Sequence, residues 1–281
     1  MTHPGQLLKQ ANLYAGKELG QNFLCDSGTA ESIVDKTGID ANSHVLEIGP
    51  GLGALTAPIA RRTKNLTAVE KDSRLVGLLS SQLEEQGLGF VTIVNQDILK
   101  TDIREIAAGE ELVVISNLPY NISSQVLLKL IENKVCIEKA FLMFQKELAV
   151  RIMAAPGGRD YSRLSAVAQY AAKVSWCTDI GPRAFFPRPD VDSTILGFEF
   201  YRETGFDADQ EKILFRMVKA AFSKRRKTLK NSLAHPELGL DKKGTGPLLT
   251  AAGIDPARRA ETLDVEEFKA LTRAYVNLNR G

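Results

Sequence analysis

The stretch that decides the fold is HVLEIGPGLGALT, residues 44–56, where a short apolar run leads directly into three closely spaced glycines. The first five residues have the length and the branched apolar side chains of a buried strand. Gly49, Gly51 and Gly53 let the backbone turn sharply and approach a ligand closely, and the helix expected after them then points its N-terminus at that ligand. The stretch therefore predicts a strand, a ligand-binding turn and a helix in succession.

Short apolar runs alternate with amphipathic stretches along the first half of the chain. The expected strands are 44–48, 66–69, 90–94, 112–116 and 139–144, and the expected helices are 54–63, 73–86, 123–132 and 145–153. This alternation favours βαβ units, and almost continuously apolar strands fit a sheet covered on both faces. We therefore expect an α/β fold with a doubly wound, mostly parallel sheet, closed by residues 194–200 as an antiparallel edge strand.

The strand signal disappears beyond Tyr201. The expected helices in the remainder are 210–222, 227–233, 248–253 and 265–278. A chain of 281 residues is long enough for about two domains, at roughly 100–200 residues each. We therefore expect an α/β domain in residues 1–200 and a small all-α domain in residues 201–281.

Charge is shared unevenly between these two parts. Residues 1–200 have a net charge of −3 and residues 201–281 a net charge of +5, and Lys212–Pro236 holds eight Lys and Arg residues and no acid. A basic segment of this kind is typical of a surface that binds a polyanion, although a solvated helix face is the alternative. The candidate phosphate contacts are Lys219, Lys224, Arg225, Arg226, Lys227 and Lys230.

Composition excludes several classes of protein. The chain is 44% hydrophobic and 25% charged, as in ordinary globular proteins, and no apolar run approaches the about 20 residues of a membrane helix. No apolar segment typical of a secretory signal stands in residues 1–24. Three scattered cysteines and three histidines predict neither a disulfide framework nor a metal site. We expect a soluble, cytoplasmic monomer with no metal and no membrane partner.

Acids follow the next two expected strands. Glu70 ends the second strand, where a carboxylate meets ribose hydroxyls, and Asp97 follows the third, where it accepts from an adenine amino group. Gly49, Gly51 and Ala54 also satisfy the dinucleotide pattern G-x-G-x-x-G/A, so a nicotinamide cofactor is an alternative. That cofactor accounts for Glu70 but not for Asp97. S-adenosylmethionine (SAM) accounts for both acids.

The fourth expected strand ends in SNLPYN, residues 116–121. The exocyclic nitrogen of adenine is a poor nucleophile because its lone pair is delocalised into the ring. The side-chain oxygen of Asn117 and the carbonyl of Leu118 would accept its two N–H groups and release that lone pair. Pro119 stiffens the loop, and Tyr120 offers a ring for the unstacked base. The motif therefore predicts methylation of an adenine amine, achieved mainly by positioning.

These motifs together resemble those of the ribosomal RNA adenine N6-dimethyltransferases, in particular the KsgA/RsmA type that acts on the small subunit. The resemblance covers nearly the whole chain. It is carried in order by Gly20–Leu24, Glu47–Thr56, Glu70–Asp72, Gln96-Asp97, Asn117–Tyr120, Gln145–Glu147, Tyr161–Ser165, Phe185–Ser193, Arg225–Leu233 and Arg258–Leu263.

The resemblance implies a Rossmann-like, SAM-dependent catalytic domain in residues 1–200 and a domain that binds RNA and the ribosome in residues 201–281. It implies that Tyr120 and Phe185 sandwich the target adenine. It also implies dimethylation of two adjacent adenosines in the 3′-terminal hairpin of 16S rRNA, within an immature 30S subunit. The residues expected to bind SAM, with Gly51 added from the glycine turn, are Asn22, Leu24, Gly49, Gly51, Glu70, Asp97 and Asn117.

Two other functions share part of this pattern. Methyltransferases of the erythromycin-resistance type have the same fold and a similar Asn-Leu/Ile-Pro-Tyr/Phe motif but modify 23S rRNA, and Val191–Ser193 with Arg258–Leu263 favours the small-subunit type. The second alternative is a ribosome-assembly factor that holds SAM as a structural ligand. The intact motif Asn117–Tyr120 favours catalysis over that alternative.

Overall fold

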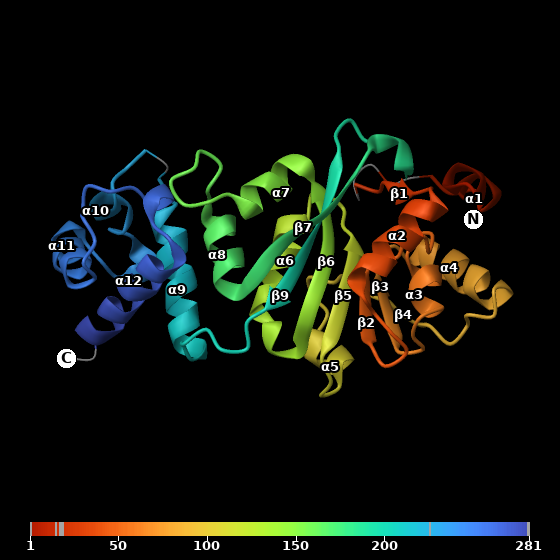
Figure 1. Cartoon of the computed structure of the whole chain (residues 1–281), viewed down its shortest axis with the longest axis horizontal. Coiled ribbons are helices and arrows are strands. Elements are labelled where there is room, and N and C mark those ends of the chain that lie inside the picture. The colour runs from red at the N-terminus through yellow and green to blue at the C-terminus, as the bar shows by residue number, and fades with distance from the viewer. Residues whose placement is uncertain (1, 15, 17–19, 225, 280–281) are drawn as a thin grey trace. The chain divides into compact units, whose positions relative to one another are not determined.

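A computed structural model of the chain describes residues 2–14, 16, 20–224 and 226–279 (Figure 1). The chain divides into two compact units. The N-terminal unit comprises Met1–Ala149 and Lys173–Phe200, and the C-terminal unit comprises Val150–Ala172 and Tyr201–Gly281. One division thus falls where the sequence places a domain boundary, after residue 200. Residues 150–172, which the sequence analysis placed in the first domain, pack with the second unit.

The N-terminal unit is built on a seven-stranded sheet with the order β4-β3-β2-β5-β6-β9-β7 (Figure 1). Its strands are β2 (His44–Ile48), β3 (Leu66–Glu70), β4 (Thr92–Asn95), β5 (Leu112–Asn117), β6 (Ile137–Gln145), β7 (Ala172–Ile180) and β9 (Ser193–Phe200). Strands β2 to β6 pair in parallel, and β9 runs antiparallel to β6. The predicted doubly wound, mostly parallel sheet is confirmed.

Burial explains why these segments become strands. Leu112–Ile115 of β5 are all buried, and successive side chains of a strand point to opposite faces, so helices cover both faces of the sheet there. A large apolar cluster joins β2, β3 and β5 to three helices on one face through Val34 of α2, Ile59 of α3 and Leu79 of α4. The periodic apolar side chains that predicted these elements therefore form the core.

The helices of this unit include short and irregular ones. They are α1 (Pro4–Gln10), α2 (Ser27–Thr37), α3 (Thr56–Ala60), α4 (Ser73–Glu85), α5 (Ile103–Ala107) and α6 (Ser123–Glu132), with the 3-10 turns η1 (Lys134–Cys136) and η2 (Pro182–Ala184). Helix α7 (Lys146–Met153) contains the point where the chain passes from one unit to the other.

Two parts of the sheet differ from the prediction. β9 is not the edge strand, because β7 lies beyond it. β7 exposes Lys173, Ser175 and Asp179, so its sequence lacks the apolar run by which the other strands are found. A separate two-stranded sheet pairs β1 (Phe23–Leu24) with β8 (Phe185–Phe186). Two-residue strands carry no periodicity, so this long-range pairing leaves no local signal.

The C-terminal unit is built from helices, as predicted. They are α8 (Arg163–Ala171), α9 (Ala208–Ala221), α10 (Leu229–Ser232), α11 (Lys242–Ala251) and α12 (Val265–Leu278), with the 3-10 turns η3 (Pro236–Leu238) and η4 (Ala260–Thr262). Tyr170 of α8 explains why residues 150–172 belong here. Its hydroxyl donates to Glu211 Oε1 at 2.8 Å and its ring packs edge-on against Phe215, both on α9.

None of the helices described in either unit is long and apolar enough to cross a membrane.

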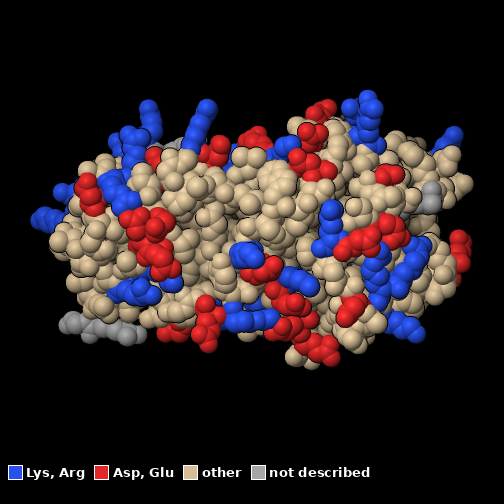
Figure 2. Space-filling view, viewed as in Figure 1, with Lys and Arg blue, Asp and Glu red and all other residues tan. Residues whose placement is uncertain are grey.

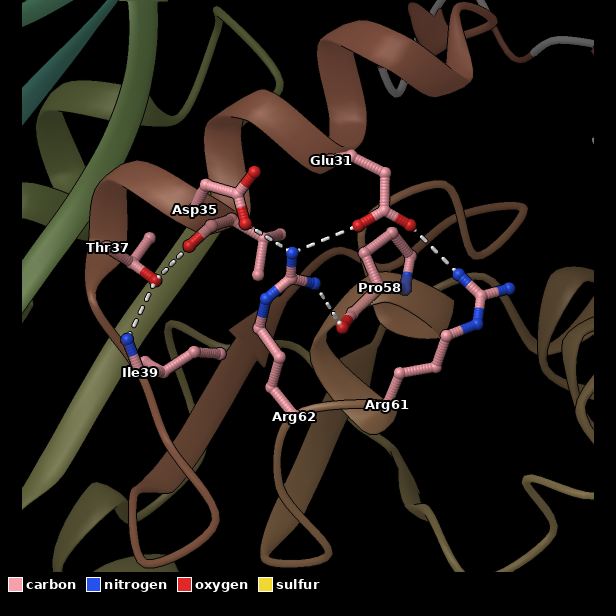
Figure 3. Close-up of polar contacts among 8 residues, drawn as sticks. Glu31, Asp35, Thr37, Ile39, Pro58, Arg61 and Arg62 are labelled. Carbon is pink, nitrogen blue, oxygen red and sulfur yellow. Dashed lines mark hydrogen bonds and ion pairs between the residues drawn. The ribbon is translucent and has the colours of Figure 1, made fainter.

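An ion-pair network fastens α2 to the end of α3 (Figure 3). Arg62 bridges Glu31 Oε2 at 3.0 Å and Asp35 Oδ1 at 2.5 Å, and it also donates to the carbonyl of Pro58 at 2.8 Å. Arg61 adds one bond to Glu31 Oε1 at 3.0 Å. The side chain of Arg62 is 24% exposed and that of Arg61 is 55% exposed. Arg62 therefore has more partners and less competition from water.

We expect Arg62→Met to lower the free energy of unfolding by about 1–3 kcal/mol, because it removes several charged hydrogen bonds in a partly buried position. Arg61→Met is the matched control and should change it by less than about 1 kcal/mol. Urea denaturation followed through Trp176, the single tryptophan, reports on the N-terminal unit. Equal losses in the two variants would contradict this account of the network.

Candidate active site

A cleft opens at the carboxyl ends of β2, β3 and β5, where ligands bind in open α/β sheets. Phe185 does not line it. The other residues predicted for the cofactor and for catalysis do, and they are Asn22, Leu24, Gly49, Gly51, Glu70, Asp97, Asn117, Leu118, Pro119 and Tyr120. The topology therefore brings together five segments that lie far apart in the sequence.

The glycines of the turn after β2 are explained by its backbone conformation and by the side chains packed against it. Gly49, Gly51 and Gly53 all have positive φ, at 67°, 57° and 81°. A Cβ on Gly51 would lie 3.0 Å from the ring of Phe23, and one on Gly53 would lie 2.6 Å from Leu79 Cδ1. At these two positions a side chain would crowd a neighbour inside the unit, in addition to the strain of the positive φ. At Gly49 a Cβ would meet no atom within 4 Å, so only its backbone conformation demands glycine.

Glu70 fastens this turn to the end of β3. Its Oε2 accepts from the N–H of Gly51 at 3.0 Å, and its Oε1 accepts from the N–H of Asp72 at 2.8 Å. Burial raises the pKa of Glu70, and the two N–H groups oppose that rise. Each carboxylate oxygen has a second lone pair, so the group retains acceptors for a pair of hydroxyls.

Asp97 lies where an amino group would meet an acceptor. Its Oδ1 accepts from the N–H of Leu99 at 3.0 Å, and its Oδ2 pairs with Lys71 Nζ at 3.0 Å. Burial opposes ionisation, but Lys71 and the Leu99 N–H outweigh it and hold the pKa of Asp97 below its usual value. The group therefore remains a carboxylate, which only accepts hydrogen bonds.

Asn117 is held in one orientation by the N-terminal segment. Its Nδ2 donates to the backbone carbonyl of Asn22 at 3.0 Å, a bond that only the amino side of the amide can make. Its Oδ1 therefore faces away from that carbonyl and is left as an acceptor in the cleft. The adjacent Ser116 Oγ donates to the carbonyl of Ile48 at 2.5 Å, which ties the end of β5 to the end of β2.

Tyr120 is held at two points in the loop after β5. Its carbonyl accepts from Ser123 Oγ at 3.0 Å, and its hydroxyl shares a hydrogen bond of 2.7 Å with Ser193 Oγ. Burial raises the pKa of Tyr120, and the bond to Ser193 opposes that rise. The hydroxyl is therefore protonated at neutral pH, and the ring presents an aromatic surface at the cleft.

Glu47 is a candidate site residue that the sequence predicts only as part of the glycine motif. The residue lines the cleft and is 2% exposed, and its Oε2 is buried without a hydrogen-bond partner. Burial raises its pKa to about 8, the Thr56 hydroxyl lowers it, and nearby Glu70 raises it further. An acid inside an otherwise apolar strand was the signal in the sequence.

The polar side chains that line the cleft indicate which class of cofactor it can bind. Glu47, Glu70 and Asp97 supply carboxyl groups from three adjacent strand ends. Acceptors of this kind fit a ligand that carries positive charge, hydroxyls and an amine. They suit a pyrophosphate less well, because ionised Asp97 repels its charge and carboxylate acceptors offer it no hydrogen-bond donors. The cleft therefore fits a cationic nucleoside better than a dinucleotide.

Comparison with known proteins agrees with this geometry. A sequence profile of the ribosomal RNA adenine dimethylases matches residues 13–280. The chain belongs to this family. The ribosomal RNA small subunit methyltransferase A of Desulforapulum autotrophicum is 54% identical over 279 residues, which are 99% of this chain and 98% of that protein.

Two solved structures share the fold of this adenine dimethylase. A dimethyladenosine transferase from Plasmodium falciparum superposes with a TM-score of 0.78 at 25% identity, covering 92% of this chain and 98% of that one. The 23S rRNA methyltransferase ErmE superposes with a TM-score of 0.65 at 24% identity, covering 91% and 100%. The second likeness shows the fold alone.

Phe185 is the expected site residue that this dimethylase does not bring to the cleft. Its side chain is 3% exposed and packs in the apolar cluster with Leu24 and Ile180. The reason is the pairing of β8 with β1, which sets Phe185 opposite Leu24. Phe185 therefore adds no ring to the cleft lining, where the aromatic residue besides Tyr120 is Phe23. Stacking by Phe185 would require β8 to move and remains a prediction.

The five basic candidates of the dimethylase that the structure describes fall into two groups. Lys224, Arg226, Lys227 and Lys230 are exposed, and no ion pair involves them within the described part of the chain. Lys219 pairs with Glu237 at 2.5 Å. Arg225 lies outside the described residues. Figure 2 shows Lys and Arg side chains projecting from the C-terminal unit on the face in view.

Glu47→Gln should change how stability depends on pH. The carboxyl ionises near its ordinary 4.5 in the unfolded chain and at about 8 in the folded one. Stability is therefore full below pH 4.5 and falls as pH rises toward 8, because the unfolded chain releases the proton first. The variant should gain stability relative to the wild type by up to about 1.4 kcal/mol for each pH unit in that window.

Urea denaturation at pH 5 and pH 8 measures this gain. Glu84→Gln, on the exposed face of α4, controls for the loss of an acid. The two proteins would differ in free energy of unfolding by the same amount at both pH values if Glu47 were ionised throughout, which would contradict the raised pKa.

Proposed function

We propose that this chain transfers methyl groups from SAM to the N6 atoms of two adjacent adenosines in the 3′-terminal hairpin of 16S rRNA, dimethylating each. The observation that carries the proposal is the fixed amide of Asn117. Its Nδ2 is bound to the Asn22 carbonyl, so its Oδ1 is held as an acceptor beside a cleft lined by carboxyl groups. That arrangement suits an amine substrate and a cationic cofactor together.

The residues that would hold the cofactor follow from the strand ends. Glu70 offers the acceptors for ribose hydroxyls and Asp97 the acceptor for the adenine amino group. The segment Asn22–Leu24 and the backbone at Gly49 and Gly51 line the same cleft. SAM supplies the methyl group when bound, and its net positive charge suits these acids.

The chain itself does its chemistry by positioning. Asn117 Oδ1 and the Leu118 carbonyl accept the two N–H groups of the target amine, which favours a pyramidal nitrogen with an available lone pair. Pro119 restricts the loop that carries both acceptors. The Tyr120 ring stacks on the extruded base, a contact worth about 1–3 kcal/mol. Fixing the amine in line with the methyl group then lowers the barrier, and a strong base is not required.

The small ribosomal subunit is the substrate we infer. The relative that is 54% identical is named a small subunit methyltransferase, whereas the likeness to ErmE carries information on the fold alone. The exposed cations Lys224, Arg226 and Lys227 support RNA binding by the C-terminal unit. We further propose that the protein acts as a monomer in the cytoplasm, on a 30S subunit that is still immature.

Methyl transfer from labelled SAM to 30S subunits from a strain that lacks the modification tests the function. Digestion to nucleosides should give N6,N6-dimethyladenosine, and it should come from the 3′-terminal hairpin. Label in 23S RNA alone would overturn the substrate and keep the chemistry. Absence of transfer to either RNA, with SAM still bound, would favour a ribosome-assembly factor instead.

Asn117→Ala should abolish methyl transfer, to below about 1% of the wild-type rate, because it removes one of the two acceptors that grip the amine. SAM should still bind, with its Kd raised about tenfold or less, because Glu70 and Asp97 are untouched. Turnover under saturating SAM and calorimetric titration separate the two effects. Asn133→Ala, at the end of α6, is the control. Near-normal turnover in Asn117→Ala would contradict the proposed role of Asn117 in holding the target amine.

The salt dependence of RNA binding tests the basic residues. Each cation that neutralises a phosphate contributes about 0.7–0.9 to the slope of log K against log salt. Lys224→Ala combined with Lys227→Ala should therefore reduce that slope by about 1.4–1.8. Lys212→Ala is the control, since Lys212 pairs with Asp209 at 2.9 Å. An unchanged slope in the double variant would place RNA binding elsewhere.

A further inference from the structure

The hydrogen bond between Tyr120 and Ser193 joins the catalytic loop to a strand that comes much later in the sequence. The two hydroxyl oxygens lie 2.7 Å apart. Ser193 is fully buried and is the first residue of β9. It also ends the segment Val191–Ser193, which the proposed mechanism leaves without a role.

Ser193 is fixed by its surroundings. It stands opposite Gln145 in the antiparallel pairing of β9 with β6. On one side of it, the carbonyl of Asp192 accepts from the N–H of Lys146 at 3.0 Å. On the other, Thr194 Oγ1 donates to Asp179 Oδ1 at 2.8 Å. The Ser193 hydroxyl is therefore presented from a backbone that is anchored on both sides.

Tyr120 is less constrained without this partner. It lies between β5 and α6, outside both, where the ring depends on local contacts for its orientation. The bond from Ser123 fixes its backbone carbonyl and leaves the side-chain torsions free. The hydroxyl bond to Ser193 fixes the opposite end of the ring and so the direction of its long axis. Because a phenol O–H prefers to lie in the plane of its ring, the direction of this bond also limits rotation about that axis.

We propose that Ser193 is a positioning residue, whose hydroxyl holds the Tyr120 ring in the plane in which it stacks on the target base. The inference rests on the proposed function, since it assumes that a base stacks on Tyr120. Ser193 meets the hydroxyl end of the ring, does not line the cleft, and acts on the reaction through Tyr120.

A purely structural role for the same bond makes different predictions. Buried hydroxyls need partners, and Ser193 and Tyr120 satisfy each other. If that were the whole role, removing either hydroxyl would lower the melting temperature and leave turnover per folded molecule unchanged. A positioning role instead lowers turnover and couples the two residues.

A double-mutant cycle on the full-length protein separates these roles. The variants are Ser193→Ala, Tyr120→Phe, which keeps the ring, and the two combined. Each single change should lower kcat about 5–10-fold, because the ring is then held less firmly where it stacks on the base, and the combination should cost no more than either. SAM affinity should change less than about twofold. Ser232→Ala, a buried serine of the C-terminal unit, controls for the general cost of such a change.

The inference would be overturned if the two losses in kcat multiplied in the combined variant, or if Ser193→Ala had a normal kcat. In either case an active wild type would still support the proposed function. A wild type without activity would overturn the proposed function instead.

A second measurement does not depend on activity. With tyrosine labelled by ¹³C at Cζ, Tyr120→Phe identifies the Tyr120 resonance among those of the six tyrosines. Ser193→Ala should shift that resonance and leave the other five in place. An unmoved Tyr120 resonance would overturn the inference whatever the enzyme assay shows.

Discussion

The pairing of β2 with β5 in the middle of the sheet is the constraint on which the site depends. Ile48 stands opposite Ser116, so the glycine turn after one strand and the catalytic loop after the other begin at the same level. The bond from Ser116 Oγ to the Ile48 carbonyl fixes that level with a side chain as well as with the ladder. A shift of one residue in this register would exchange the side chains that face the two layers of helices and would move the two loops apart.

The cleft holds three acids close together, and the chain keeps each in a different state. Burial holds Glu47 neutral up to a pH of about 8, two backbone N–H groups support Glu70, and Lys71 holds Asp97 ionised. Three full charges there would repel one another. Because one acid is neutral, one is bound by backbone N–H groups and one is paired with a lysine, their mutual repulsion is small. The chain can therefore fold with three acids in the cleft before a cationic ligand binds.

The sequence predicts those features of the fold and of the candidate site that depend on neighbouring residues. The strand His44–Ile48 has the bounds that the sequence predicts, and the glycine turn and Asn117–Tyr120 lie at the cleft, because each is a local pattern. The pairings of β1 with β8 and of Tyr120 with Ser193 join residues more than 70 positions apart, so no local period reports them. Burial of Phe185 has the same origin, since only the β1–β8 register reveals which way that ring turns.

The partner of the Asn117 amide is a main-chain atom of Asn22. Every amino acid carries that carbonyl, so a substitution at position 22 would keep the acceptor that orients the amide, even where it changes the side chain that lines the cleft. The orientation of the Asn117 amide depends instead on the length of the segment that contains Asn22. An insertion or deletion between Gly20 and Leu24 would move the carbonyl out of reach and let the amide rotate, although every residue of the catalytic motif remained in place.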